Sequence, residues 1–195
     1  MRKYFFLLII ILLEGCESSD SKYFQEVLSD KDITFTRIRG SKEKDSVSMN
    51  VPIGFKLNLN SSKIQDVKIY CRIDGKQLMQ IENFSIFNSK NDKMIYAIED
   101  LNYNTYPQKI FISHYQKISN KQAELLLKMY HPTASLNEII TRNDTLKLVS
   151  YKKYIKDNPQ FIKEMRKVSD SLIVSIGFFG GKSKIVEKKI KWLDK

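Results

Sequence analysis

Apolar and polar side chains alternate over much of this chain, and that spacing restricts the fold more than any other feature of the sequence. The clearest run places Val67, Ile69, Cys71 and Ile73 on one face, with polar or charged residues between them. Successive side chains of a β-strand point to opposite faces of its sheet, so a period of two predicts a half-buried strand. We therefore expect Cys71 to be a packed core thiol, because nothing near it in sequence would lower its pKa.

The same alternation recurs along the chain and predicts a series of short strands. They cover residues 33–38, 47–51, 55–59, 66–74, 78–86, 94–98, 110–115, 146–151, 172–178 and 186–192. Pro52-Ile53-Gly54 separates the second strand from the third, and the pairs Asp74-Gly75 and Gly180-Gly181 are typical of tight turns. Several short strands with few helices between them predict a mostly β fold, an antiparallel two-layer β-sandwich with an immunoglobulin-like strand rhythm.

The spacing becomes helical in two C-terminal segments. Ser119 starts a capping-box pattern for a helix that ends at His131-Pro132, and Asn158-Pro159 is a typical start for the second helix. We expect these two short α-helices to be inserted between the C-terminal strands, with a single helical turn at residues 135–138. Residues 23–28 also fit a short helix with one apolar face.

The first residues have the layout of a secretory signal peptide. Two basic residues precede an unbroken run of ten apolar residues, Tyr4 to Leu13. A membrane-spanning helix needs about 20 apolar residues, so this run is too short to be an anchor. Leu13-Glu14-Gly15-Cys16 follows the run, and here the chain resembles the bacterial lipoproteins, whose signal ends in a lipobox.

That resemblance implies cleavage after Gly15 and acylation of Cys16, so that several acyl chains would hold the protein on a membrane. It implies a protein of the cell envelope, at the outer membrane, on its periplasmic or its surface face. We accordingly divide the chain into a signal peptide (1–15), a lipidated tether with an N-terminal extension (16–46) and a single sandwich domain (47–195). The alternative is an ordinary secreted protein whose apolar run ends in a chance cysteine.

The chain is strongly basic, and most of the excess lies near its C-terminus. Its formal net charge is +11, and removal of residues 1–15 takes away two basic side chains and one acidic one, which leaves +10. Residues 145–195 carry thirteen Lys or Arg and five Asp or Glu, a net of +8. Lys188, Lys189 and Lys191 form the candidate basic binding face, which would meet an acidic protein, a glycan or anionic lipid headgroups. The alternative is a solvated face whose lysines protect an edge strand, and no nucleic-acid partner is expected of an exported protein.

The sequence offers little raw material for catalysis. The two histidines, His114 and His131, have no metal-ligand spacing, and no phosphate-binding loop or Cys-x-x-Cys pair is present. We expect His114 to be a strand residue, His131 a helix-end residue, and Glu99-Asp100 part of a turn. No catalytic residue, cofactor or metal ligand is therefore predicted.

Two classes of function stay open on the sequence. The first, which we prefer, is a lipid-anchored binding or assembly module of the cell envelope. The second is an envelope hydrolase, whose catalytic groups would have to come together from the distant positions Glu99, Asp100, His114 and His131. An envelope immunity or inhibitor protein would have the same physical properties as the first class.

Overall fold

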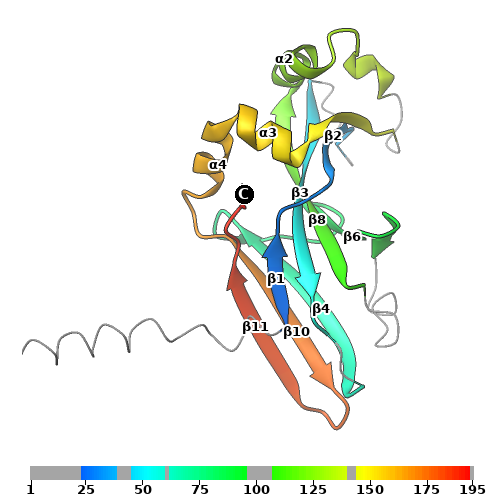
Figure 1. The fold of residues 1–195 in the computed structure, drawn as a ribbon, viewed down its shortest axis with the longest axis vertical. Coiled ribbons are helices and arrows are strands. Elements are labelled where there is room, and N and C mark those ends of the chain that lie inside the picture. The colour runs from blue at the N-terminus through cyan, green and yellow to red at the C-terminus, as the bar shows by residue number, and fades with distance from the viewer. Residues whose placement is uncertain (1–22, 39–44, 60–61, 96–106, 140–143, 194–195) are drawn as a thin grey trace, which may run out of the picture.

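Two antiparallel sheets face each other across one hydrophobic core (Figure 1). The computed structural model describes residues 23–38, 45–59, 62–95, 107–139 and 144–193. The helices gather at one end of the molecule, and a long β-hairpin forms the opposite end. The predicted fold class, a mostly β antiparallel two-layer sandwich, is confirmed.

The two sheets differ in size. Sheet A has seven strands in the order β7-β6-β8-β3-β2-β9, with β1 also paired to β3. Its strands are β1 (Phe24–Val27), β2 (Asp32–Thr36), β3 (Ser46–Leu57), β6 (Phe84–Asn88), β7 (Met94–Ile95), β8 (Lys109–Ser119) and β9 (Leu146–Ser150). Sheet B has four strands in the order β11-β10-β4-β5. Its strands are β4 (Ile64–Ile73), β5 (Lys76–Gln77), β10 (Ser171–Phe178) and β11 (Ser183–Lys189).

The alternation predicted for β4 is confirmed. Val67, Cys71 and Ile73 are buried, while Lys68 and Tyr70 lie on the outward face. Burial raises the pKa of the Cys71 thiol to about 12. Because the thiolate is the nucleophilic form, a buried thiol with this pKa is chemically inert at neutral pH.

Strand β3 is continuous for 12 residues, whereas the sequence predicted two strands separated at residues 52–54. One edge of β3 pairs with β8 along its whole length, and the other edge pairs first with β2 and then with β1. Pro52 falls between these two partners, where no neighbouring strand requires the N–H that proline lacks. A Cβ on Gly54 would lie 2.8 Å from the carbonyl oxygen of Val27, so glycine lets β1 approach β3 closely.

The folded domain begins earlier than predicted. Strands β1 and β2 belong to sheet A, so the predicted domain start at residue 47 is too late. The short helix predicted at residues 23–28 is also wrong, because Phe24–Val27 forms β1. An isolated helical turn is marginal in water, and the edge of β3 offers the same residues a ladder of hydrogen bonds.

The tight turn at Asp74-Gly75 is present, with φ of 51° and 72° at its two residues. The strand that follows it is short, however, because β5 spans only Lys76–Gln77. The chain then crosses to sheet A, where β6 pairs with β8. Only the first two residues of the strand predicted at 94–98 are described, as β7, and residues 96–98, Glu99 and Asp100 lie outside the described residues.

The helical segments are α2 (Asn120–Tyr130), the 3-10 turn η3 (Leu136–Glu138), α3 (Tyr151–Asp157) and α4 (Pro159–Met165). The predicted capping box at Ser119 and the predicted turn at residues 135–138 are confirmed. Helix α3 was not predicted. The sequence predicted a strand up to residue 151, but the strand ends at Ser150, which caps α3. None of the described helices is long and apolar enough to cross a membrane.

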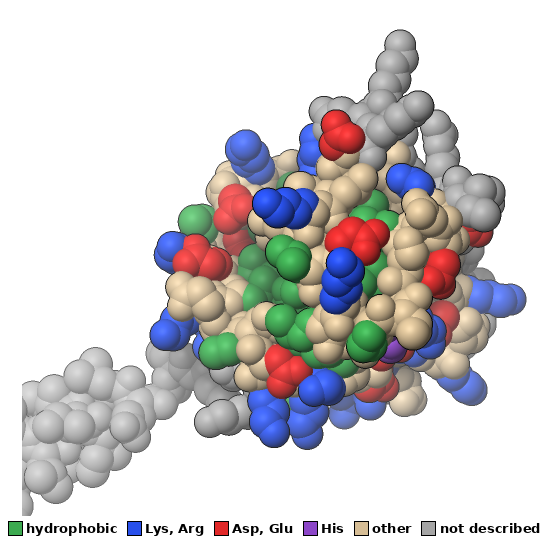
Figure 2. All heavy atoms as spheres, turned by 90° about the horizontal axis from the view of Figure 1, so that it is seen from above, with side chains coloured by type: hydrophobic (Ala, Val, Ile, Leu, Met, Phe, Trp, Pro, Cys, Tyr) green, Lys and Arg blue, Asp and Glu red, His purple; other side chains and the backbone are tan. Residues whose placement is uncertain are grey.

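Helix α4 begins at Pro159 as predicted, but Asn158 does not cap it with its side chain. The Asn158 amide nitrogen instead donates to the hydroxyl of Tyr130, 3.0 Å away, and to the carbonyl of Tyr154, 2.9 Å away. Asn158 thereby joins α2 to α3. Helix α2 exposes Leu125 and Met129. Figure 2 looks onto this helical end and shows hydrophobic side chains among charged ones.

The C-terminal segment closes the core beyond the end of β11. We call residues 190–193, together with Glu26, Arg166 and Asp170, the C-terminal clasp. Lys191 N–H donates to Glu26 Oε2 at 2.6 Å, and Trp192 Nε1–H donates to Asp170 Oδ2 at 2.8 Å. Arg166 Nη2 donates to the Trp192 carbonyl at 2.7 Å. The clasp ties the final residues to β1 and to the segment before β10.

Candidate functional site

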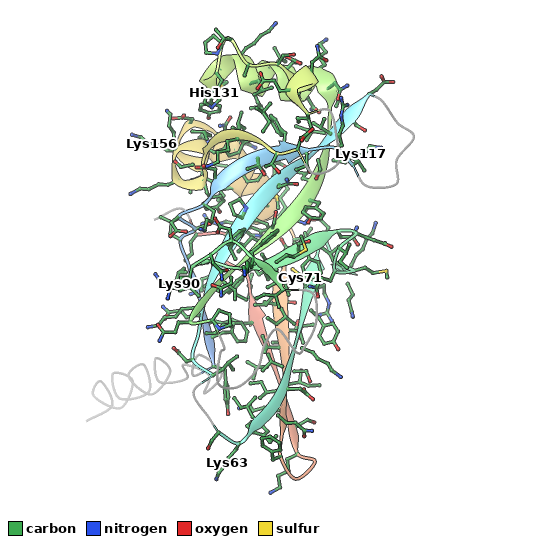
Figure 3. All side chains as sticks on the ribbon, turned by 90° about the vertical axis from the view of Figure 1, so that its right-hand side faces the viewer. Lys63, Cys71, Lys90, Lys117, His131 and Lys156 are labelled. Atoms are coloured by element: carbon green, nitrogen blue, oxygen red, sulfur yellow. The ribbon has the colours of Figure 1, made fainter. Side chains whose placement is uncertain are left out.

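The outward face of sheet A is hollowed into a groove of about 1050 Å³. Residues whose side chains alternate with the core residues of β2, β3 and β8 form its floor. They are Thr34, Thr36, Ser48, Asn50, Pro52, Ser113 and Tyr115. Lys117, which is labelled in Figure 3, lines the groove from the same strand as Ser113 and Tyr115. We call this concave surface the polar groove.

Asn50 organises the floor of the polar groove. Its Nδ2 donates to Thr34 Oγ1 at 3.0 Å and to Thr36 Oγ1 at 3.2 Å. Its Oδ1 accepts from Ser48 Oγ at 3.0 Å. These bonds fix the direction of four polar side chains before any ligand arrives, so the floor is preorganised for hydrogen bonding.

The floor residues of the polar groove are more buried than is usual for the outward face of a sheet. Only 8% of Asn50 and 7% each of Ser48 and Ser113 is exposed. Polar side chains on a flat outward face would be mostly exposed, so the surrounding structure rises above these three. A ligand in the groove would lose much of its water and would meet hydrogen-bonding groups in its place.

One end of the polar groove is apolar. The rings of Phe87 and Phe111 stack with centroids 4.9 Å apart and an interplanar angle of 8°. The Lys31 ammonium lies 5.5 Å from the centroid of the Phe111 ring. Met94 on β7 lines the same end. This end offers carbon surface to the ligand, whereas the floor offers hydrogen bonds.

Four of the charged side chains that line the groove form two ion pairs. Lys31 forms an ion pair with Asp92 at 2.6 Å, and Lys147 forms one with Asp32 at 3.3 Å. Arg37 Nε donates to the carbonyl of Ile139 at 2.8 Å. Each of these two ion pairs cancels most of its own field, so Lys31 and Lys147 attract a charged ligand only weakly.

Between its charged residues, the polar groove presents hydroxyls and amides on the floor and aromatic rings at one end, groups that can meet a ligand by hydrogen bonding and by packing. Among the residues that the structure describes, no three His, Cys, Asp or Glu side chains lie close enough to hold a metal ion. The lining of the groove contains neither a histidine nor a cysteine.

The histidines and the thiol considered in the sequence lie apart from the groove. His114 faces the core, and burial lowers the pKa of its imidazole to about 4. His131 ends α2 and contacts the carbonyl of Leu148. Figure 3 shows His131 at the helical end and Cys71 near the middle of the molecule. The structure does not bring these three side chains to one site.

The three lysines of the predicted basic face do not form one row. Lys188 lies on the inward side of β11, with its Nζ 3.5 Å from the carbonyl oxygen of Phe24. Lys189 is exposed on the outward face of sheet B, opposite Ser171, and Lys191 follows the end of the strand. Their binding role stays a prediction, as does acylation of Cys16, which lies outside the described residues.

The residue types at the outward strand positions could have indicated the polar groove, although the alternation of apolar and polar residues did not. Outward positions along β2 and the first half of β3 are mainly small hydroxyl or amide residues, namely Thr34, Thr36, Ser46, Ser48 and Asn50. Outward positions on β4 are instead mostly long side chains, three of them charged: Asp66, Lys68, Tyr70 and Arg72. A solvated face usually carries long charged side chains, so short polar residues on adjacent strands indicate a covered or ligand-binding face.

Comparisons with known proteins give no family for this chain. No family model matches it, and no curated protein matches it. Among solved structures, a match is the crystal structure of ACE19, the collagen binding subdomain of Enterococcus faecalis surface protein ACE. The two chains are 13% identical, and the match covers 85% of this chain and 97% of that one with a TM-score of 0.24. Similarity at that TM-score carries no argument about fold or function.

Proposed function

We propose that this protein is a lipid-anchored binding module of the bacterial cell envelope, and that its polar groove binds a short stretch of an uncharged glycan. The observation that carries the proposal is the preorganised floor around Asn50, whose side-chain oxygen and nitrogen hold Ser48, Thr34 and Thr36 in place. Sugar rings present hydroxyl groups as closely spaced donors and acceptors, which match a floor of this kind.

The charges and the size of the groove favour a glycan over an acidic polypeptide. An acidic ligand would have to compete with Asp32 and Asp92 for the lysines that they already neutralise. A volume of about 1050 Å³ is at the upper end for small-ligand sites and suits a few sugar rings. The carbon surface at Phe87 and Phe111 suits the apolar face of a sugar ring.

Binding can be tested with a tetramer of N-acetylglucosamine, which is uncharged and carries both hydroxyl and amide groups. We expect saturable binding by calorimetry that changes little between low and high salt, because no ion pair is formed. Ser113→Tyr should abolish binding, since it places a ring in the middle of the polar groove. Tyr115→Phe should weaken it several-fold, because it removes one hydroxyl from the floor.

The matched control for these variants lies on the other sheet. Ser175→Tyr and Tyr70→Phe make the same two changes on the outward face of sheet B, and both should leave binding unchanged. Absence of binding by the wild-type protein, or equal losses in the sheet A and sheet B variants, would refute a glycan site in the polar groove.

The anchor has its own test, which is independent of the groove. Cys16→Ser should release the protein from the membrane fraction or leave its precursor uncleaved, because the thiol is the acceptor of the acyl chain that the lipobox resemblance implies. Mass spectrometry of the wild-type N-terminal peptide should find the acyl groups. Equal membrane retention of both proteins with no acyl mass on the wild type would contradict anchoring.

A further inference from the structure

A group of lysines surrounds the point where the N-terminal tether meets the folded domain. Lys56 lies opposite Gln25 in the pairing of β1 with β3, and Lys109 lies opposite Lys56 on β8. From the other sheet, Lys184 places its ammonium 4.9 Å from the centroid of the Tyr23 ring. Together with Lys188, these residues are named the basic collar.

Lys188 completes the basic collar from β11, with its Nζ 3.5 Å from the Phe24 carbonyl oxygen. The lysines at 184 and 188 lie on the inward side of β11, opposite Ile176 and Leu172. They therefore point from the edge of sheet B toward β1 and not toward the outward face of that sheet. Lys56 and Lys109 therefore flank β1 on the outward face of sheet A, and Lys184 and Lys188 approach it from sheet B.

The carboxylate of Glu26 on β1 does not offset the positive charge of the collar lysines at the surface. Glu26 is 7% exposed, and its oxygens accept the backbone N–H groups of Lys191 and Leu193. The tether carries Glu17 and Asp20, with Lys22 after them. Four collar lysines exceed the net charge of the tether, so the region where the tether ends is cationic.

The tether is short enough to hold the basic collar beside a membrane. Six residues lie between Cys16 and Tyr23, and the seven Cα-to-Cα steps across this interval span at most about 25 Å. Anionic headgroups attract lysines within about one Debye length, roughly 8 Å at physiological salt. A short tether keeps the local concentration of the surface in the millimolar range, so contacts that are individually weak become occupied.

We propose that the basic collar is a membrane-contact surface that binds anionic phospholipid headgroups beside the acylated Cys16. This inference rests on the proposed anchor and is independent of the glycan site. It gives the domain a preferred orientation, with the collar against the bilayer. The acyl chains would hold the protein at the membrane, and the collar would supply a second, electrostatic contact.

The first experiment replaces enzymatic acylation with a chemical bond, so that it does not depend on processing in the cell. The chain that starts at Cys16 keeps every described element, and Cys71 is fully buried, so maleimide lipid couples at Cys16. Vesicles contain phosphatidylcholine alone or with one-third phosphatidylglycerol, and lysine acetylation is followed residue by residue by mass spectrometry.

The four collar lysines should react several-fold more slowly on the phosphatidylglycerol vesicles, and 1 M salt should remove the difference. The exposed lysines Lys128 of α2 and Lys152 of α3 should react equally on both vesicles. Equal rates at the collar on the two vesicles would overturn the proposal. The acyl mass on the wild-type protein would still report separately on the anchor.

A second experiment distinguishes the effect of the collar lysines on vesicle binding from the effect of the net charge of the protein. With Cys16 blocked, the uncoupled chain is sedimented with phosphatidylglycerol vesicles. Changing all four collar lysines to Gln should weaken binding at least ten-fold, since each lysine near an anionic surface contributes roughly five-fold. The control changes an equal number of exposed helix lysines, Lys121, Lys128, Lys152 and Lys156, to Gln and should weaken binding less than two-fold. Equal losses would mean that net charge alone directs the protein to the vesicle.

Discussion

Trp192→Ala should lower the free energy of unfolding by about 3–5 kcal/mol. The Trp192 side chain is 1% exposed, and its ring lies 6.4 Å from that of His114, centroid to centroid, at 65°. Removal of the ring leaves a cavity in the C-terminal clasp. It also leaves the Asp170 carboxylate without the indole N–H that now lies 2.8 Å from it, and an unsatisfied buried acceptor adds to the loss.

Urea unfolding followed by far-UV circular dichroism measures the effect in both proteins. Trp192 has a φ of 51°, and alanine at that φ is strained as tryptophan is, so the comparison reports on the ring and not on the backbone. Trp192→Phe is the matched variant, because it keeps a six-membered aromatic ring and loses the five-membered ring with its N–H donor. Its loss should be smaller than that of the alanine variant. A loss under about 1 kcal/mol for Trp192→Ala would contradict a structural role for the clasp.

Acidification from pH 7 to pH 4 should cost about 3 kcal/mol of stability through His114 alone. Burial lowers the pKa of His114 from 6.5 to about 4. Between these two values the unfolded chain binds a proton at this residue and the folded protein does not. The contribution is therefore absent at pH 7 and grows as the pH falls, because protons stabilise the unfolded state.

His114→Gln removes the titrating group and should remove this part of the pH dependence. Burial raises the pKa of Glu26 and of Asp170, so these carboxyls act in the opposite direction, and only the difference between variant and wild type isolates His114. Unfolding free energies at pH 7, 6, 5 and 4 should give a difference that changes by about 3 kcal/mol across the series. Parallel curves for the two proteins would exclude His114. His131→Gln, at the exposed end of α2, controls for loss of a histidine elsewhere.

The polar groove depends on strand neighbours that the sequence pattern does not specify. Asn50 binds Thr34 and Thr36 because β2 pairs with the first half of β3. The pattern around Pro52 predicted an interruption there, and β3 instead continues past the proline and changes its partner. Local sequence reports which face of a strand is buried, and it does not report which strand lies alongside.

The arrangement of the basic residues also depends on strand neighbours that the sequence does not specify. Consecutive lysines at the end of β11 predict a cationic surface. The direction in which each lysine points, however, depends on how sheet B packs against β1. Lys188 turns toward Phe24, and Lys189 turns to the outward face. The basic collar also draws on Lys56 and Lys109 of sheet A, which lie far from β11 in sequence. Charge counts by segment cannot find such a group.

The sequence alone determined the mostly β class, the inward face of β4 with Cys71, the capping boxes of α2 and η3 and the inward position of Trp192. All of these follow from the residue period and from side-chain to backbone bonds within a few residues. Tertiary structure decided that Phe24–Val27 is a strand, that Tyr151–Asp157 is a helix and that β6 crosses to sheet A. It also hollowed the outward face of sheet A into a groove. Those features arise from hydrogen bonds and burial between distant segments, whose free energy exceeds the small local preferences of the residues involved.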